Sequence, residues 1–231
     1  MPLALRKFSL KLSRGEILGL AGIDGNGQKE LVDALTGLRP VITGTVTLEN
    51  KNITNLTPQE IYQNKLSMIP EDRQRRGLVM DFSVKENFVL QTIDQKPFSQ
   101  YGLIITRELN KFAQQLLERF DIRPRNAELK ASELSGGNQQ KIILAREIVN
   151  NPDVLIAFQP TRGLDVGAIE YVHRELIKLR DQNKAILLIS YELDEILNLS
   201  DRILVIAEGK CTGEFINPTK EEVGLAMGGA K

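Results

Sequence analysis

The sequence contains a single cysteine, Cys211, and a single histidine, His173. One cysteine excludes an intrachain disulfide, and such sparse usage fits a reducing compartment. His173 has no cysteine or carboxylate at ligand spacing, and a metal site needs several ligands. We therefore expect no metal site around His173, which the sequence places in a helix.

Long apolar runs are also absent. Residues 1–15 do not resemble a signal peptide, and no stretch approaches the ~20 apolar residues of a membrane-spanning helix. Basic and acidic side chains balance at 30 each, so the chain lacks the basic excess typical of a general nucleic-acid binder. The sequence therefore predicts no nucleic-acid partner, and any action at a membrane requires docking onto a protein that spans it.

What the chain does have is an alternation of short apolar runs and amphipathic stretches over residues 1–79 and 151–231. Residues 80–150 are mainly helical in pattern, with Ser83 capping one helix. This predicts one α/β domain with an inserted helical subdomain, in which residues 228–231 fray. Strands are expected over residues 16–21, 45–48, 67–69, 154–157, 185–189 and 203–206, helices over 27–37, 58–64, 107–120, 168–180 and 193–199, and a loop over 98–102.

A glycine-rich segment follows the first expected strand. Its spacing is that of a phosphate-binding P-loop, in which glycines turn backbone N–H groups toward phosphate oxygens and a helix N-terminus adds partial positive charge. Here an uncharged glutamine replaces the motif's lysine, which costs about 1.5–3 kcal/mol. The lysine stands one position after the place that the motif gives it, which on a helix turns its side chain by roughly 100° about the helix axis. A glycine-rich turn without a ligand stays an open alternative. The candidate residues are Gly22, Asp24, Gly25, Asn26, Gly27, Gln28, Lys29 and Glu30.

A second candidate anion site is the segment LSGGNQQK, residues 134–141, at the start of another expected helix. Ser135 can cap that helix, and Gly136 and Gly137 allow close backbone approach. An ordinary helix cap with flexible glycines is the alternative.

LSGGNQQK resembles the signature motif of ABC ATPases. Residues 156–165 are similar to the Walker B strand and D-loop of that family, while residues 69–79 and 188–193 stand where it has its Q-loop and switch histidine. The resemblance covers nearly the whole chain and implies a P-loop NTPase core over 1–79 and 151–231, with a mixed sheet, and a helical signature subdomain over 80–150. The residues within these motifs are similar to those of the ATPases of bacterial monosaccharide and nucleoside importers, in which two nucleotide-binding domains are fused in one chain. The P-loop segment DGNGQ resembles that of the second, C-terminal domain.

The departures from the family pattern fall on its chemistry. Phe158 replaces the aspartate that helps to hold Mg²⁺, Gln159 the glutamate that polarises water, and Tyr191 the switch histidine. Glu71 replaces the Q-loop glutamine, so its charge needs compensation by Mg²⁺ or Arg73. A positioned acid or base is worth 10²–10⁴-fold and a metal several kcal/mol more. The resemblance thus implies no intact catalytic residue in this domain, with ATP held by backbone groups and Mg²⁺ only weakly, if at all.

The same resemblance implies a division of labour between two paired domains. The signature of this chain would close over ATP held by an intact N-terminal nucleotide-binding domain, with Asp165 of the D-loop at the seam. Further partners would be membrane permease subunits and, indirectly, an extracytoplasmic solute-binding protein, which places the chain peripherally on the cytoplasmic face of the membrane. The residues offered to the partner's ATP are Ser135, Gly136, Gly137, Asn138 and Gln139.

Two alternatives stay open: a self-sufficient ATPase in which Lys29 reaches the phosphates, and a non-transport ABC module with a regulatory role. The resemblance implies a sugar or a nucleoside as the solute, and we favour a nucleoside. Related domains carry an early strand with an aromatic residue that stacks on adenine, and residues 1–12 supply only the strand after it. We therefore expect the chain to be part of a longer polypeptide.

Overall fold

The structure is a computed structural model that describes residues 5–228. Except for Gly228, the segment expected to fray lies outside the described residues. The chain forms two compact units. The sheet unit runs up to Met68 and resumes over Pro152–Gln159 and from His173 onward, and the helical unit comprises Ile69–Asn151 and Pro160–Val172.

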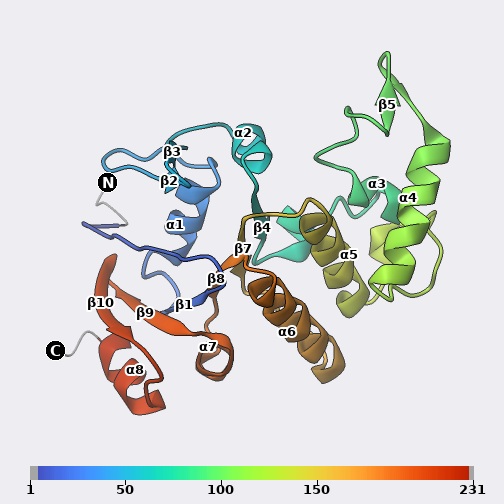
Figure 1. Ribbon diagram of the computed structural model, residues 1–231. Coiled ribbons are helices and arrows are strands. Elements are labelled where there is room, and N and C mark those ends of the chain that lie inside the picture. The colour runs from blue at the N-terminus through green and yellow to red at the C-terminus, as the bar shows by residue number, and fades with distance from the viewer. Residues whose placement is uncertain (1–4, 229–231) are drawn as a thin grey trace. The chain divides into compact units, whose positions relative to one another are not determined.

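The sheet unit is built on a six-stranded sheet of order β10-β9-β1-β8-β7-β4 (Figure 1). β1 pairs in parallel with β8 and β9, β7 pairs in parallel with β8, and β10 runs antiparallel to β9. β1 and β8 are buried along their whole length, which explains their nearly continuous apolar sequences. The expectation of a mixed sheet is confirmed. The strands are β1 (Ile17–Ala21), β4 (Leu66–Ile69), β7 (Val154–Phe158), β8 (Ala185–Ile189), β9 (Arg202–Ala207) and β10 (Lys210–Phe215).

Helices and a small hairpin complete the sheet unit. Thr57 and Thr219 each form a reciprocal capping box with the glutamate three residues later. At Gly19 in β1, an added Cβ would lie 2.3 Å from Ser200 Oγ, so glycine permits α7 to pack closely on β1. These elements are α1 (Gln28–Leu35), α2 (Pro58–Gln63), α7 (Leu193–Leu199), α8 (Lys220–Met227), and the paired strands β2 (Thr47–Leu48) and β3 (Lys51–Asn52); α6 (Val166–Asp181) begins in the helical unit and ends in the sheet unit.

The helical unit contains α3 (Val84–Phe88), α4 (Thr106–Arg119) and α5 (Gly136–Val149). Ser83 caps α3 as expected, and Glu86 returns the contact to the Ser83 hydroxyl and backbone N–H. These two hydrogen bonds, the hydroxyl's being the larger effect, lower the pKa of Glu86. The unit also contains a π-helical turn, Arg73–Gly77, and a 3₁₀ turn, Ala131–Glu133.

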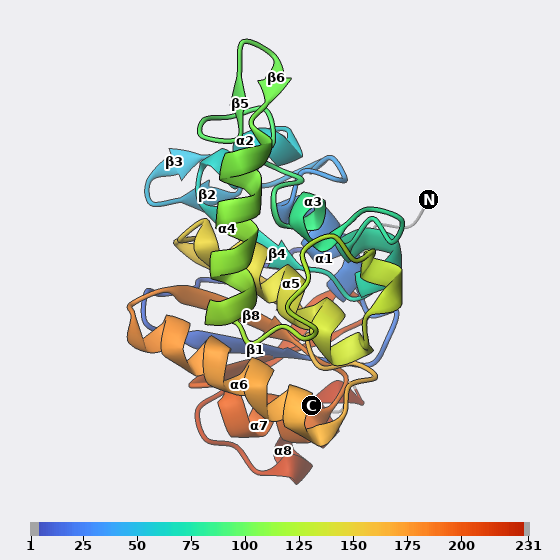
Figure 2. The ribbon, with the colours of Figure 1, turned by 90° about the vertical axis from the view of Figure 1, so that its right-hand side faces the viewer.

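The loop expected over residues 98–102 is wrong in part. Ser99–Gln100 is strand β5, which pairs antiparallel with β6 (Leu103–Ile104). The resulting hairpin projects beyond the N-terminal end of α4 (Figure 2). Tyr101 and Gly102 both have positive φ at its turn. Strands of two residues are too short to produce a period-2 pattern, so the sequence did not reveal them.

No helix among residues 5–228 is both long enough and apolar enough to cross a membrane.

Candidate nucleotide-binding site

The glycine-rich segment forms the turn between β1 and α1. Gly25 and Gly27 have φ values of 86° and 112°, a region that residues with a Cβ rarely adopt. At Gly22, an added Cβ would lie 2.6 Å from both Ile206 O and Gln28 Nε2. No side chain caps the N-terminus of α1, so the first backbone N–H groups of the helix are not bonded to a capping side chain. This backbone geometry is suited to phosphate oxygens.

Gln28, in the position of the P-loop lysine, is turned into the loop. The residue is only 1% exposed, and its Nε2 donates to Ile23 O at 3.1 Å. Its Oε1 is buried without a hydrogen-bond partner among the described residues. The amide therefore braces the loop from inside and brings no positive charge to it. The next side chain, that of Lys29, is exposed.

Asn26, within the loop, and Glu30, in the helix that follows it, contact residues outside the loop. Asn26 Nδ2 donates to Ile206 O at 3.3 Å, and its Oδ1 accepts from the Glu208 backbone N–H at 3.2 Å. Glu30, in the first turn of α1, lies 4.0 Å from Arg39 Nη1. Asn26 therefore ties the glycine loop to the end of β9.

An aromatic pair occupies the two positions at which the resemblance predicts a metal ligand and a histidine. Phe158 ends β7 and is 4% exposed, and its ring meets that of Tyr191 edge-on, with centroids 6.3 Å apart. Tyr191 also donates its hydroxyl hydrogen to Asp24 Oδ1 at 2.8 Å. The phenol thus joins the core of the sheet unit to the glycine loop, and Asp24 adds a carboxylate to a loop with phosphate-binding geometry.

Gln159 follows Phe158 in a left-handed backbone conformation, with φ 52°. Its backbone N–H donates to Ile189 O at 2.8 Å, which continues the pairing of β7 with β8. The side chain is buried, and Nε2 has no hydrogen-bond partner among the described residues. A carboxamide at this position cannot accept a proton from water.

These residues fit the phosphates of a nucleotide but not a metal. Among residues 5–228, no three His, Cys, Asp or Glu side chains are grouped to hold an ion. Phe158 offers no oxygen, Gln28 Oε1 is a single neutral oxygen buried inside the loop, and the Asp24 carboxylate is already bonded to Tyr191. The glycine backbone and the uncapped start of α1 are the groups that would hold phosphate oxygens.

The signature segment forms the N-terminus of α5 in the helical unit. Ser135 is exposed and caps the helix, with Oγ accepting from Asn138 N at 3.4 Å and from Asn138 Nδ2 at 3.0 Å. Gly136 and Gly137 are half-buried. Gln139 is only 3% exposed, and its Nε2 donates to the carbonyls of Ala131 and Leu134, each at 3.1 Å. The buried Gln139 side chain therefore stabilises the signature turn through hydrogen bonds to the backbone that precedes it.

Glu71 is paired with an arginine that the sequence did not suggest. Its Oε1 lies 2.6 Å from Arg162 Nη1, whereas the sequence pointed to Mg²⁺ or Arg73 as the compensating charge. Asp72 caps the π-helical turn by accepting hydrogen bonds from the backbone N–H groups of Arg75 and Gln74. These hydrogen bonds, that from Arg75 first, lower the pKa of Asp72. The charge of Glu71 is thus neutralised within the helical unit.

Asp165 and His173 also find local partners. Asp165 Oδ1 accepts from the Ala168 backbone N–H at 2.9 Å, near the start of α6. His173 Nε2 lies 2.8 Å from Glu195 Oε1, and Glu195 belongs to α7. The two residues are 22 positions apart, so sequence spacing gave no signal for this pair.

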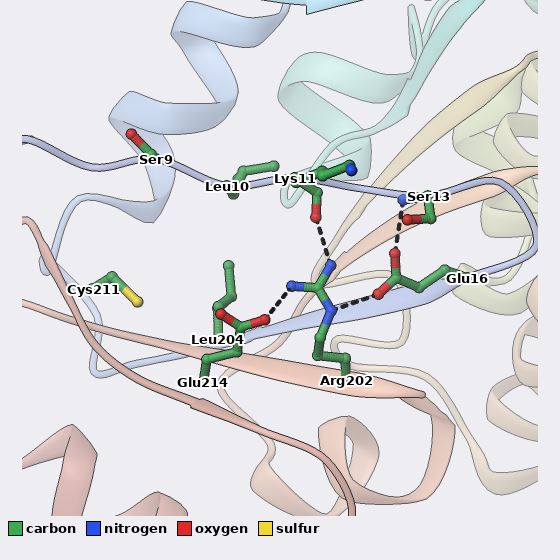
Figure 3. Close-up of a pocket in the computed structure, with 9 residues that line it drawn as sticks. All are labelled: Ser9, Leu10, Lys11, Ser13, Glu16, Arg202, Leu204, Cys211 and Glu214. Carbon is green, nitrogen blue, oxygen red and sulfur yellow. Dashed lines mark hydrogen bonds and ion pairs between the residues drawn. The ribbon is translucent and has the colours of Figure 1, made fainter.

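A pocket of about 530 Å³ lies between the segment that precedes β1 and the strands β9 and β10 (Figure 3). Arg202 fills it, donating to Glu16 Oε1 and Glu214 Oε1, each at 2.7 Å, and to Lys11 O at 2.5 Å. The hydrogen bond to Glu16 is the main cause of its raised pKa. All three contacts lie within the protein. Arg202 therefore links the segment before β1 to β9 and β10, and we assign the pocket a structural role.

A glycine loop between the first strand of a mainly parallel sheet and the following helix defines a P-loop nucleoside triphosphatase fold. A signature-like helix start accompanies it in the helical unit. The chain belongs to the ABC transporter family, whose sequence model matches residues 5–162.

Known relatives agree with this assignment. The nucleoside import ATP-binding protein NupA of Lactococcus lactis is 53% identical over 98% of this chain, and a glucose import ATP-binding protein of Haloferax volcanii is 42% identical over 98%. The chain spans only 45% and 42% of their respective lengths. A dimeric bacterial ABC transporter cassette matches with a TM-score of 0.77 and 25% identity, over 94% of this chain and 91% of that one.

Proposed function

We propose that this chain is a nucleotide-binding domain of an ABC importer that does not hydrolyse ATP at its own site and completes the ATP site of a partner domain. The observation that carries the proposal is a contrast. Phe158 and Tyr191 form an aromatic pair tied to the glycine loop, while Ser135 stands exposed as the cap of α5. The chain's own nucleotide site would lack the groups that hydrolyse ATP, whereas the signature segment would keep the geometry that binds it.

At the chain's own site, the backbone amides around Gly25 and Gly27 and the N-terminus of α1 would bind ATP phosphates. Bound Mg²⁺ would screen phosphate charge, but the one carboxylate of residues 22–28, that of Asp24, already accepts a hydrogen bond from Tyr191. The proposed architecture is an α/β core, residues 1–79 and 151–231, with a helical signature subdomain, residues 80–150. It would be the C-terminal of two such domains.

At the partner's site, Ser135, Gly136 and Gly137 would face the nucleotide, with Asp165 beside them. Asn138 and Gln139 would hold the turn in shape through their contacts with Ser135, Ala131 and Leu134. The partner is an intact N-terminal nucleotide-binding domain. The dimeric cassette that matches this fold supports such pairing.

The transport assignment follows the relatives. NupA, named for nucleoside import, is more similar to this chain than the glucose import protein is, at 53% against 42% identity. We therefore favour a nucleoside over a sugar as the solute. The domain would work at the cytoplasmic face of the membrane with permease subunits, and a solute-binding protein would deliver the solute from the other side.

The proposal is tested by titrating this chain with ATP by calorimetry, with and without Mg²⁺, and then assaying ATP hydrolysis alone and after adding an intact ABC nucleotide-binding domain. We expect ATP binding that Mg²⁺ scarcely improves, background hydrolysis alone, and strong hydrolysis in the mixture. Brisk hydrolysis by the isolated chain that Lys29→Ala abolishes would instead favour a self-sufficient ATPase. A mixture no faster than the added domain would favour a regulatory module.

Replacing Asp24 with asparagine is expected to tighten ATP binding by about fivefold. The carboxylate repels phosphate, and one charge in a partly screened loop is worth about 1 kcal/mol. Asparagine keeps an oxygen that can accept from the Tyr191 hydroxyl. Calorimetry measures the change, and Asp181→Asn, at the C-terminal end of α6, is the charge-matched control. An unchanged or weaker affinity in D24N would show that Asp24 does not oppose nucleotide binding.

A further inference from the structure

The segment Glu71–Gly77 makes specific contacts with both the signature helix and the D-loop, all within the helical unit. Glu71 pairs with Arg162 at 2.6 Å. Arg73 Nη1 donates to Arg162 O at 2.7 Å, and Nη2 lies 3.5 Å from Gly163 O. The D-loop is therefore held through one ion pair and by an arginine bound to its backbone.

The same segment holds the signature helix. Gln74 Nε2 donates to Gln139 Oε1 at 3.3 Å, beneath the signature turn. An added Cβ at Gly77 would lie 2.5 Å from Ile143 Cδ1, so glycine lets the π-helical turn lie flush against α5. A backbone this close to a helix leaves little room for independent movement.

Arg73 is the residue common to both contacts. An added Cβ at Gly136 would lie 2.8 Å from Arg73 Nη2, so the guanidinium packs against the backbone of the signature turn. Its Nε is buried with no hydrogen-bond partner among residues 5–228. On the other side of the turn, an added Cβ at Gly137 would lie 3.1 Å from Ala168 Cβ and 3.6 Å from Asp165 Oδ2. The signature glycines thus lie between Arg73 and the start of α6.

We propose that Arg73 is a positioning residue that holds the signature turn and the D-loop in one fixed arrangement, so that both meet the partner's ATP together. This inference rests on the proposed function. A planar guanidinium can bond the D-loop carbonyls and pack on a glycine at the same time, which a lysine ammonium cannot do. Fixing the two segments in advance spares the assembly the entropy of ordering them when ATP is bound.

The positioning role is tested first in the isolated chain by amide hydrogen exchange. In Arg73→Gln, exchange should rise about tenfold at the protected amides of both segments, namely Gln139 in the signature and Leu164 in the D-loop. The control is Arg75→Gln, because the Arg75 side chain is 88% exposed. An R73Q chain that exchanges like R75Q would overturn the proposal whatever its activity.

The second test is hydrolysis by the assembly of this chain with the intact domain. R73Q should lower kcat roughly 10- to 100-fold while leaving KM for Mg-ATP within about threefold, and Arg73→Lys should not restore kcat. R75Q should match the wild type. A lysine that restores full kcat would overturn the role of the planar guanidinium.

A double-mutant cycle covers the case in which R73Q is poorly folded. Gly136→Ala should raise D-loop exchange in the wild-type background, because its methyl group displaces Arg73, but should add little in an Arg73→Ala background. Additive effects would contradict the contact. If the wild-type assembly itself fails to hydrolyse ATP, the proposed function falls, and the ATP-facing part of this inference falls with it.

Discussion

Replacing Ser135 with arginine is expected to abolish the ATP hydrolysis that this chain supports in a partner domain, with a loss of at least about 100-fold. Ser135 is the exposed cap of α5, and its Oγ accepts from Asn138. The substitution removes that cap, which is worth about 1 kcal/mol. It also places a long cation against the positive end of the helix dipole, where the partner's phosphates would lie. The measurement is the steady-state rate of the reconstituted assembly.

Two variants separate the causes of that loss. Ser132→Arg introduces the same side chain at an exposed serine of the neighbouring 3₁₀ turn and should leave the rate unchanged. Ser135→Ala removes only the cap and should cause a smaller loss than S135R. If S135R retains the rate of S132R, the signature does not act on the partner's ATP, and the proposed function is wrong.

Replacing Arg146 with alanine is expected to destabilise the protein by about 3–5 kcal/mol. Arg146 Nε lies 2.8 Å from Glu147 Oε1 inside α5, with side-chain exposures of 6% and 1%. Without Arg146, the carboxylate of Glu147 stays buried and loses the positive charge beside it, keeping the hydrogen bond from Gln91. The cost is a large fraction of the stability of a typical domain. Urea unfolding followed by circular dichroism measures it.

Arg125, whose side chain is 52% exposed, provides the matched control, and Arg125→Ala should change stability by less than about 1 kcal/mol. The double variant Arg146→Met with Glu147→Leu removes both charges and should recover most of the loss, because neither buried charge of the pair then remains. An R146A protein as stable as R125A would contradict the stabilising role of this buried pair.

The sequence revealed those elements whose apolar pattern is clear over neighbouring residues. Strands β1, β7, β8 and β9 were expected within one or two residues of their bounds, because each is a short apolar run. The helices α1, α2, α4, α6 and α7 were also expected near their observed places. In contrast, β10 and α8 were missed. β10 is exposed along much of its length and contains Gly213, so its polar sequence lacks the pattern of a buried strand.

The site divides in the same way. Motif spacing placed the glycine loop, and Ser135 caps α5 as its sequence suggests. The partners of Glu71 and Tyr191 could not be read from the sequence. Glu71 and Arg162 are 91 positions apart, and Tyr191 and Asp24 are 167 positions apart, so the tertiary fold alone determines these contacts. Which of two nearby arginines neutralises a carboxylate depends on where the backbone turns.

The strand order also bears on how the polypeptide is made. β1 is synthesised long before its neighbours in the sheet, β8 and β9. All the residues of the helical unit are translated in between. β1 therefore leaves the ribosome as an apolar segment whose partner strands have not yet been made. Such delayed pairing slows folding and favours aggregation. We expect nascent chains that stop before β8 to depend on chaperones for solubility.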